Sequence, residues 1–522
     1  MLRRRFNTTG PCVEGRHYLI DPLSRLPEAP GFIEQGAYFV VHAPRQSGKT
    51  TTILALAREL TRQGQYAAVY SSCQVAADTE DVGQAIGALI HRLRMNAEQQ
   101  LAPELLPPTP PDAPPIVALV AFLSAWSQAC PRPVVLLLDE IDSLKGSPLL
   151  SVLHQLRDGF HLDRPKAFPW SVILCGMKDV RDYKAASGGD PTRLGTSSPF
   201  NIKLKSLRIG DFDPDEINTL LDQHTADTGQ AFTPEARAEI FTYTQGQPWL
   251  TNALANEIIE EMAVTGPITA EHVERAKENL ILARATHLDS LAHKLQEPRV
   301  RRILTPLLAG DIVPYDETFD DDLTYVRDLG LVTPRLPLQA ANPIYREVIT
   351  RVLGQNIEAS LTLPPKPSYV RPDGSLDIER LLTEFLAFWK RHGEALGRRE
   401  TYHEIAAQLV LMAWLQRVVN GGGYVEREYA IGKGAIDLQI RWPLPAGGWQ
   451  QEAFELKTRA PHDGDPLEEG LEQLDRYLDQ LGLETGTLVI FDRRPDALPI
   501  AQRSGLGEAT TPAGRMVKLL RG

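Results

Sequence analysis

Aliphatic runs alternate with helical patterns along the first part of the chain. Segments rich in aliphatic and other β-favouring residues predict strands at 38–41, 66–72, 134–138, 171–175 and 201–204. The run at 134–138 is aliphatic throughout, which is typical of a strand buried on both faces of a parallel sheet. Strands that alternate with helices predict an α/β fold built on a doubly wound parallel sheet.

Helical patterns replace this alternation further along the chain. Residues 212–290 predict helices only, and residues 296–355 predict short helices, a small hairpin and a closing helix. Residues 360–374 have the composition of a linker. A second α/β unit follows, with predicted helices at 376–396 and 401–420, strands at 424–431, 434–442 and 449–458, a helix at 467–482 and a strand at 487–492.

Composition sets limits on this picture. A chain of 522 residues is too long for a single core, so we expect several domains. A net charge of −12 means that any nucleic-acid surface is a local patch and not a property of the whole chain. The four cysteines are widely spaced and form no Cys-x-x-Cys pair, which predicts buried free thiols instead of a disulfide framework or a zinc site.

The chain shows no signal for a membrane. The N-terminal residues MLRRRFNTTG lack the apolar core of a signal peptide, and no apolar run reaches the roughly 18 residues that a span needs. We therefore expect a cytoplasmic protein with no membrane partner. The Pro-rich segment 101–115 excludes helix and central strand, and predicts a surface spacer or a stiff arm for a partner.

The strand at 38–41 leads into a candidate phosphate-binding loop. A strand, a tight loop and a helix bring backbone N–H groups and a helix N-terminus onto phosphate oxygens. Gly48 allows close approach, Lys49 would reach the β- and γ-phosphates, and the Thr50 hydroxyl would bind Mg²⁺. A chance Gly-Lys-Thr on a loop is the alternative. The predicted ATP-binding residues are Ala43, Pro44, Arg45, Gln46, Ser47, Gly48, Lys49, Thr50 and Thr51.

Two acidic residues end the buried strand at 134–138. The carboxyl ends of parallel strands are where open α/β sheets bind their ligands. Asp139 would hold Mg²⁺ through water, and Glu140 would polarise the attacking water as a general base. The alternative is that both acids begin a solvated helix.

Together these motifs resemble the prokaryotic AAA-like ATPases, relatives of the signal-transduction ATPases with numerous domains. The resemblance is carried by FNTTG at 6–10, HAPRQSGKTT at 42–51, LLLDEID at 136–142, SPFN at 198–201 and GQP at 246–248. It implies a P-loop sheet of the ASCE type, a helical lid and a winged helix. It also implies that residues around Phe6 and Tyr18 lie near the adenine, and the Gly-Gln-Pro helix start could touch the base or ribose.

Other parts of an ATPase site are less defined. The residues after Cys175 lack the polar γ-phosphate sensor that such ATPases carry, and Arg181 or Arg193 could act as an arginine finger or form surface ion pairs. The predicted winged helix carries Arg299, Arg301 and Arg302, which could contact DNA phosphates. Closure over the nucleotide is the alternative role of that domain.

A second candidate site lies in the C-terminal unit. Residues two apart in a strand share a face, so Glu455 and Lys457 point the same way, and the preceding hairpin brings Asp437 beside them. Oxygens of Asp437, Glu455 and the Leu456 carbonyl would hold Mg²⁺. Lys457 would orient the attacking water on a phosphodiester.

This pattern resembles the PD-(D/E)XK nuclease superfamily. GAID at 434–437 and ELK at 455–457 match its two core motifs, and Gln473 with Tyr477 matches the Gln-x-x-x-Tyr element of one branch. The resemblance implies a catalytic set of Asp437, Glu455, Lys457, Gln473 and Tyr477. Glu404, next to His403 on the preceding helix, could complete the acidic cluster, and Glu428 is a weaker candidate.

The chain is thus interpreted as a Mg²⁺-dependent ATPase coupled to a nuclease that acts on DNA, in defence or mobile-element processing. The alternatives are an ATP-dependent signalling switch or scaffold, and a winged-helix DNA-binding regulator, each with a non-catalytic nuclease-like domain. A homo-oligomer is an open alternative to a monomer. The predicted domains are a P-loop ATPase core at 1–210, a helical lid at 211–290, a winged helix at 291–357, a linker at 358–375 and a restriction-endonuclease-like α/β domain at 376–522.

Overall fold

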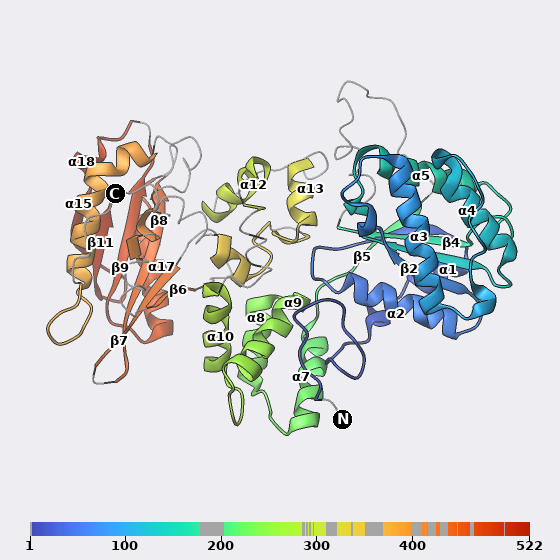
Figure 1. Cartoon of the computed structure of the whole chain (residues 1–522). Coiled ribbons are helices and arrows are strands. Elements are labelled where there is room, and N and C mark those ends of the chain that lie inside the picture. Colours follow the sequence, from blue (N-terminus) through green and yellow to red (C-terminus); the bar gives the residue numbers. More distant parts are fainter. Residues whose placement is uncertain are drawn as a thin grey trace. The chain divides into compact units, whose positions relative to one another are not determined.

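The computed structural model divides into two compact units (Figure 1). The first unit comprises residues 1–283 and 325–331, and the second comprises residues 284–324 and 332–522. The structure describes residues 3–177, 203–283, 288, 291, 294–295, 297–309, 321–335, 338–349, 369–397, 407, 410–412, 414–415, 424–428, 437–445, 447–459, 464–494 and 496–522.

The first unit is built on a five-stranded sheet with the order β2-β3-β4-β1-β5, and every neighbouring pair is parallel. The predicted parallel α/β sheet is therefore confirmed. Its strands are β1 (Tyr38–His42), β2 (Ala67–Ser72), β3 (Val134–Asp139), β4 (Ser171–Gly176) and β5 (Lys203–Arg208). Every residue of β3 and β4 is buried, because helices cover both faces of the sheet.

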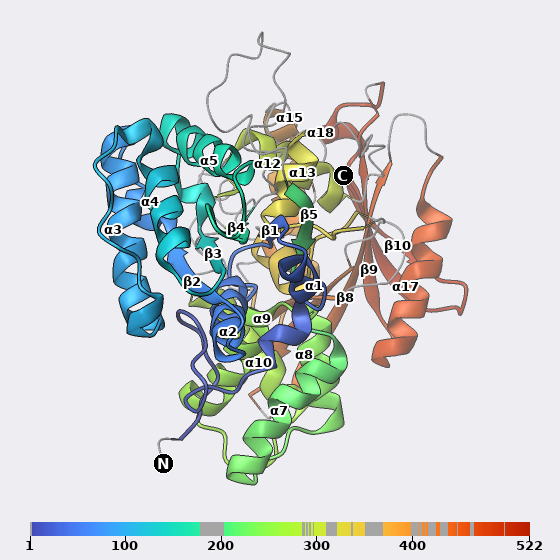
Figure 2. The same ribbon diagram turned by 90° about the vertical axis from the view of Figure 1, so that its right-hand side faces the viewer.

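Two apolar clusters form the core on the two faces of this sheet. One joins the strands to α3 (Val82–Gln100), α4 (Pro115–Ala129) and α5 (Gly146–Phe160), and these helices lie side by side in Figure 2. The other joins them to α1 (Ala29–Glu34) and α2 (Lys49–Arg62). Short 3₁₀ turns connect these elements at η1 (Pro22–Arg25), η2 (Cys73–Ala76), η3 (Pro103–Leu105) and η4 (Ile141–Ser143).

The Pro-rich segment 101–115 is docked at both ends. Contrary to the prediction of no helix, Pro103–Leu105 forms a 3₁₀ turn and Pro115 begins α4, since proline is tolerated in the first turn of a helix. Leu105 is buried, and its carbonyl oxygen accepts a 2.9 Å hydrogen bond from Trp126 Nε1. The segment is therefore anchored on α4 at this point.

Helices follow the sheet, as predicted. They are α7 (Pro214–Thr228), α8 (Pro234–Thr244), α9 (Pro248–Asn256), the π-helical turn η6 (Glu257–Glu261) and α10 (Ala270–Leu282). Proline occupies the first turn of α7, α8 and α9, and the side chain of the preceding residue caps each of these helices. Helix α12 (Pro298–Ala309) belongs to the second unit, and the boundary between the units falls within the next helix, α13 (Asp321–Asp328).

The second unit contains a six-stranded mixed sheet with the order β10-β11-β9-β8-β7-β6. Strands β6, β7 and β8 form an antiparallel meander, whereas β9 pairs in parallel with β8 on one side and with β11 on the other. The strands are β6 (Tyr424–Glu428), β7 (Asp437–Pro443), β8 (Trp449–Arg459), β9 (Gly486–Asp492), β10 (Gly505–Thr510) and β11 (Met516–Arg521). Helix α15 (Ile378–Gly397) precedes the meander, α17 (Leu467–Leu481) connects β8 to β9, and α18 (Ile500–Arg503) precedes β10.

The sequence predicts neither a membrane span nor a disulfide framework. In the described part of the chain, no helix combines the length and apolar content that a bilayer span requires. All four cysteines are free thiols, with Cys73 and Cys175 buried and Cys12 and Cys130 partly exposed.

Candidate functional site

The candidate phosphate loop connects β1 to α2. Gln46 and Gly48 adopt positive φ angles of 59° and 86°, and Gly48 stands at the N-terminus of α2. Lys49 is the first residue of this helix, and its Nζ donates hydrogen bonds of 2.7 Å to Ala43 O and 2.6 Å to Pro44 O. Burial lowers the pKa of the Lys49 ammonium below its ordinary value. The helix N-terminus and the buried cation together form a site for an anion.

Thr50 and Asp139 meet across the sheet, although β4 separates β1 from β3. Thr50 Oγ1 donates a 2.7 Å hydrogen bond to Asp139 Oδ2, and Asp139 is only 1% exposed. Asp139 Oδ1 accepts a 2.8 Å bond from the backbone N–H of Glu140. A hydroxyl and a carboxylate oxygen in contact are hard ligands of the type that Mg²⁺ prefers, so these residues fit the predicted cation.

Glu140 is held by a residue that the sequence did not single out. Strand β2 pairs with β3 in a register that places Ser72 opposite Asp139. Ser72 Oγ donates a 2.6 Å hydrogen bond to Glu140 Oε2, and Glu140 has a positive φ of 54°. Tyr70 of the same strand donates a 3.3 Å bond from its hydroxyl to Asp139 Oδ2. Both residues lie at the polar C-terminal end of β2, which is otherwise apolar, and this polar end is the feature of the sequence that could have indicated them.

A cavity lies beside the loop, and four parts of the first unit line it. They are the N-terminal segment, the phosphate loop with the start of α2, the connection from β5 to α7, and the start of α9. The lining includes Asn7, Thr8, Leu19, Ile20, Arg25, Gln46, Gly48, Thr51, Phe212, Pro248, Trp249 and Asn252. The predicted Gly-Gln-Pro helix start is therefore at the cavity, and Gln247 Nε2 donates a 3.4 Å bond to Gln46 O.

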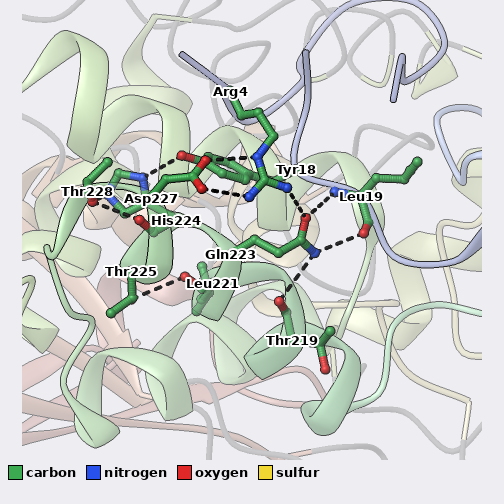
Figure 3. A network of polar contacts seen from close by, with 10 residues as sticks. All are labelled: Arg4, Tyr18, Leu19, Thr219, Leu221, Gln223, His224, Thr225, Asp227 and Thr228. Carbon is green, nitrogen blue, oxygen red and sulfur yellow. Dashed lines mark hydrogen bonds and ion pairs between the residues drawn. The ribbon is translucent and has the colours of Figure 1, made fainter. Parts of the chain in front are cut away.

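Phe6 and Tyr18 themselves pack behind this cavity. Their rings are 4.7 Å apart, and the Tyr18 hydroxyl lies 3.2 Å from His224 Nδ1 (Figure 3). Arg4 forms a 2.8 Å ion pair with Asp227, also on α7. Gln223 bonds to both backbone polar groups of Leu19. Asn7, Thr8 and Leu19, their neighbours in the sequence, line the cavity, whereas the two aromatic rings do not. These contacts fix the N-terminal segment to α7.

Residues 33–183 match a protein-family model described as an AAA domain. The match contains the phosphate loop, the acidic end of β3 and the strands β1 to β4. Residues 33–183 form an AAA-type P-loop ATPase domain. Arg181 and Arg193, the two candidate arginine fingers, lie outside the described residues. Of the four residues after Cys175 where a polar sensor is missing from the sequence, Gly176 and Met177 are described and Lys178 and Asp179 are not.

Several solved structures also resemble this chain. A Walker-type ATPase of Pyrococcus abyssi shares 13% sequence identity at a TM-score of 0.47, over 67% of this chain and 99% of that chain. The Holliday junction branch migration motor RuvB of Thermotoga maritima shares 14% identity at a TM-score of 0.34, over 62% of this chain and 92% of that chain. No curated protein matches the chain.

The C-terminal candidate centre gathers around Lys457 on β8. Lys457 Nζ lies 3.3 Å from Glu455 Oε1, which belongs to a fully buried side chain. The same ammonium donates to Gln473 Oε1 on α17 and, at 3.3 Å, to Glu469 Oε1. Gln473 Nε2 in turn donates a 3.0 Å bond to Glu469. The predicted Glu455, Lys457 and Gln473 are thus brought together, and Glu469 is a member that the sequence did not indicate.

The remaining predicted residues of this centre differ in position. Tyr477 is buried in an apolar cluster with Leu474, Leu478 and Leu488. Asp437 begins β7 and pairs with Glu428 of β6. In the antiparallel pair of β7 and β8, Leu438 lies opposite Phe454, so the same register places the backbone of Asp437 opposite that of Glu455. His403 and Glu404 lie outside the described residues. Within the described part of the chain, no group of three His, Cys, Asp or Glu side chains could hold a metal ion.

The predicted DNA-contacting arginines lie on α12. Asp322 forms ion pairs with two of them, at 3.2 Å from Arg299 and 2.8 Å from Arg302. Their charge is partly balanced within the protein, which reduces the positive field available to a phosphate backbone.

Proposed function

We propose that the chain couples ATP hydrolysis by its AAA domain to Mg²⁺-dependent cleavage of DNA by its C-terminal α/β domain. The AAA-domain match over residues 33–183 supports the ATPase half of this proposal. The nuclease half rests mainly on one observation: Lys457 of β8 contacts both Glu455 of the same strand and Gln473 of helix α17.

In the ATPase half, the residues take distinct roles. Loop N–H groups and Lys49 bind the phosphates, and Thr50 with Asp139 would hold Mg²⁺, which supplies positive charge that offsets the developing charge on the phosphates. Glu140 accepts a proton from the attacking water, and Ser72 fixes the orientation of its carboxylate.

Topology supports the nuclease half. The order α15, β6, β7, β8, α17, β9 combines an antiparallel meander with a helical crossover to a parallel strand. This order fits the core expected of a PD-(D/E)XK domain. In this proposal Asp437, Glu455 and the Leu456 carbonyl would hold Mg²⁺, which would supply positive charge at the phosphodiester, and Lys457 would orient the attacking water. Gln473 positions the Lys457 ammonium through their hydrogen bond.

The test is Mg²⁺-dependent cleavage of DNA by the full chain. Lys457→Met keeps the length of the side chain but removes the charge, and we expect cleavage to fall by at least about 100-fold, the lower range for loss of one electrostatic group at a reacting centre. Lys390→Met, at an exposed lysine of α15, is the matched control and retains cleavage. Equal cleavage by wild type and Lys457→Met contradicts the assignment.

A non-catalytic nuclease-like domain is the second candidate, because the Lys457 ammonium lies 3.3 Å from Glu455 Oε1, an oxygen that the catalytic proposal assigns to the metal. In that case the protein is an ATP-dependent switch that binds nucleic acid or a protein partner. It would bind DNA without Mg²⁺-dependent cleavage, and Lys457→Met would leave that binding unchanged.

A further inference from the structure

Arg25 occupies the junction of three elements around the nucleotide cavity. It ends η1, and its Nη1 donates a 3.1 Å hydrogen bond to Ser47 O of the phosphate loop. Its Nη2 donates to Gly210 O, in the connection from β5 to α7. The guanidinium carbon lies 4.8 Å from the centre of the Phe212 ring. The side chain is thus held in a fixed orientation against the loop.

The guanidinium also lies close to the backbone that would receive phosphates. A Cβ atom added to Gly48 would stand 3.3 Å from Arg25 Nη1. Arg25 lines the cavity together with Gly48, Thr51 and Thr52. The lining of this cavity includes neither Thr50 nor Asp139, the two residues whose contact forms the predicted Mg²⁺ site.

The charge of Arg25 has no ion-pair partner among the residues that the structure describes. The acceptors of its two hydrogen bonds are neutral carbonyl oxygens. Burial lowers the pKa of Arg25 from its ordinary value, while Glu216 and Asp211 act on it only at longer range. A partly desolvated cation that faces a cavity is stabilised by an anion in that cavity.

We propose that Arg25 contacts the phosphate nearest the ribose, the α-phosphate that ATP and ADP share. The inference rests on nucleotide binding by the AAA domain and adds a phosphate ligand from outside its loop. Arg25 then contributes to affinity for both nucleotides, in contrast to an arginine finger, which acts on the γ-phosphate.

Calorimetric titration of the full chain with ATP and with ADP tests this role. For Arg25→Met we expect both dissociation constants to rise by a similar factor of about 10 to 100, the range for a hydrogen bond between charged groups. Arg25→Lys keeps the charge and should lose less. Arg58→Met, at an exposed arginine of α2, is the matched control and should bind as wild type does.

The melting temperature without nucleotide separates a ligand contact from a structural role. Unchanged affinities with a lowered melting temperature would make Arg25 a structural residue and overturn the inference. A loss confined to ATP would place the contact at the γ-phosphate and overturn the α-phosphate assignment. If wild type bound neither nucleotide, the ATPase function itself would fail; if wild type binds and Arg25→Met binds equally, only the role of Arg25 fails.

Discussion

Ser72 donates a 2.6 Å hydrogen bond to Oε2 of Glu140, the residue assigned as general base of the ATPase. The bond orients the carboxylate and leaves Oε1 for the attacking water. Removing the hydroxyl by Ser72→Ala should lower kcat for ATP about five-fold, the equivalent of one hydrogen bond of roughly 1 kcal/mol. The dissociation constant for ATP should stay the same.

Steady-state hydrolysis and ATP titration measure these two quantities. Ser143→Ala, on the 3₁₀ turn that follows Glu140, is a control of the same residue type. A fall in ATP affinity without a fall in kcat would show that Ser72 serves the binding site and does not position Glu140.

Gly330 packs against Pro44 of the phosphate loop. Its φ is +73°, and an added Cβ would lie 2.6 Å from Pro44 Cγ. The segment 325–331 belongs to the first unit, although it follows α12 of the second unit in sequence. We predict that Gly330→Ala displaces the loop and raises the dissociation constant for ATP several-fold.

Gly229→Ala controls for the backbone cost of this substitution. Gly229 has a nearly equal φ of +74° and no atom within 4 Å of an added Cβ, so it carries the strain of about 1 kcal/mol without the clash. If both variants bind ATP equally, the contact with Pro44 has no effect on the loop.

Glu452 gives the second unit a pH-dependent stability. The side chain is 7% exposed, and burial raises its pKa to about 7, although Thr487 and Lys518 oppose the shift. Because the folded state binds this proton more tightly, the stabilisation is complete below the unfolded pKa of about 4.5 and is lost as the pH rises through 7. The loss amounts to about 3 kcal/mol at most.

Thermal unfolding of the full chain between pH 5.5 and 8 measures this effect. The transition of the second unit should move to lower temperature as the pH rises, and Glu452→Gln should flatten the dependence. Glu508→Gln, at an exposed glutamate of β10, should leave it intact. A dependence of opposite sign would rule out Glu452 as its source.

Gln473 positions Lys457, so Gln473→Ala should reduce DNA cleavage about ten-fold while Mg²⁺-free DNA binding is retained. Gln480→Ala, at an exposed glutamine of the same helix, is the control. Equal cleavage by both variants would remove Gln473 from the centre.

Strands β3 and β4 of the first sheet were predictable because they are buried on both faces and carry mostly apolar residues, unlike the edge strand β5 with its sequence KLKSLR. Strands β10 and β11 were not, because GLGEAT and MVKLLR carry neither a continuous apolar run nor a clean alternation. Helix α3 extends to Gln100 although its last three residues are polar, because Ala97 is buried in the core.

The motifs located the loop and the acidic strand end, but not their supporting residues. Arg25 precedes Ser47 by 22 positions, and Ser72 precedes Glu140 by 68. No local spacing rule connects residues so far apart, and only strand order brings them together. Glu469 and Gln473 are one helical turn apart, so their shared face was predictable from sequence.

The coupling of the two activities is tested most directly by the rate of Mg²⁺-dependent DNA cleavage with and without ATP, in wild type and Glu140→Gln. We predict that ATP stimulates cleavage by wild type, and that Glu140→Gln binds ATP but loses the part of this stimulation that requires hydrolysis. Lys457→Met should cut under neither condition. A wild-type chain that hydrolyses ATP but cleaves no DNA would contradict the account and leave an ATP-dependent switch.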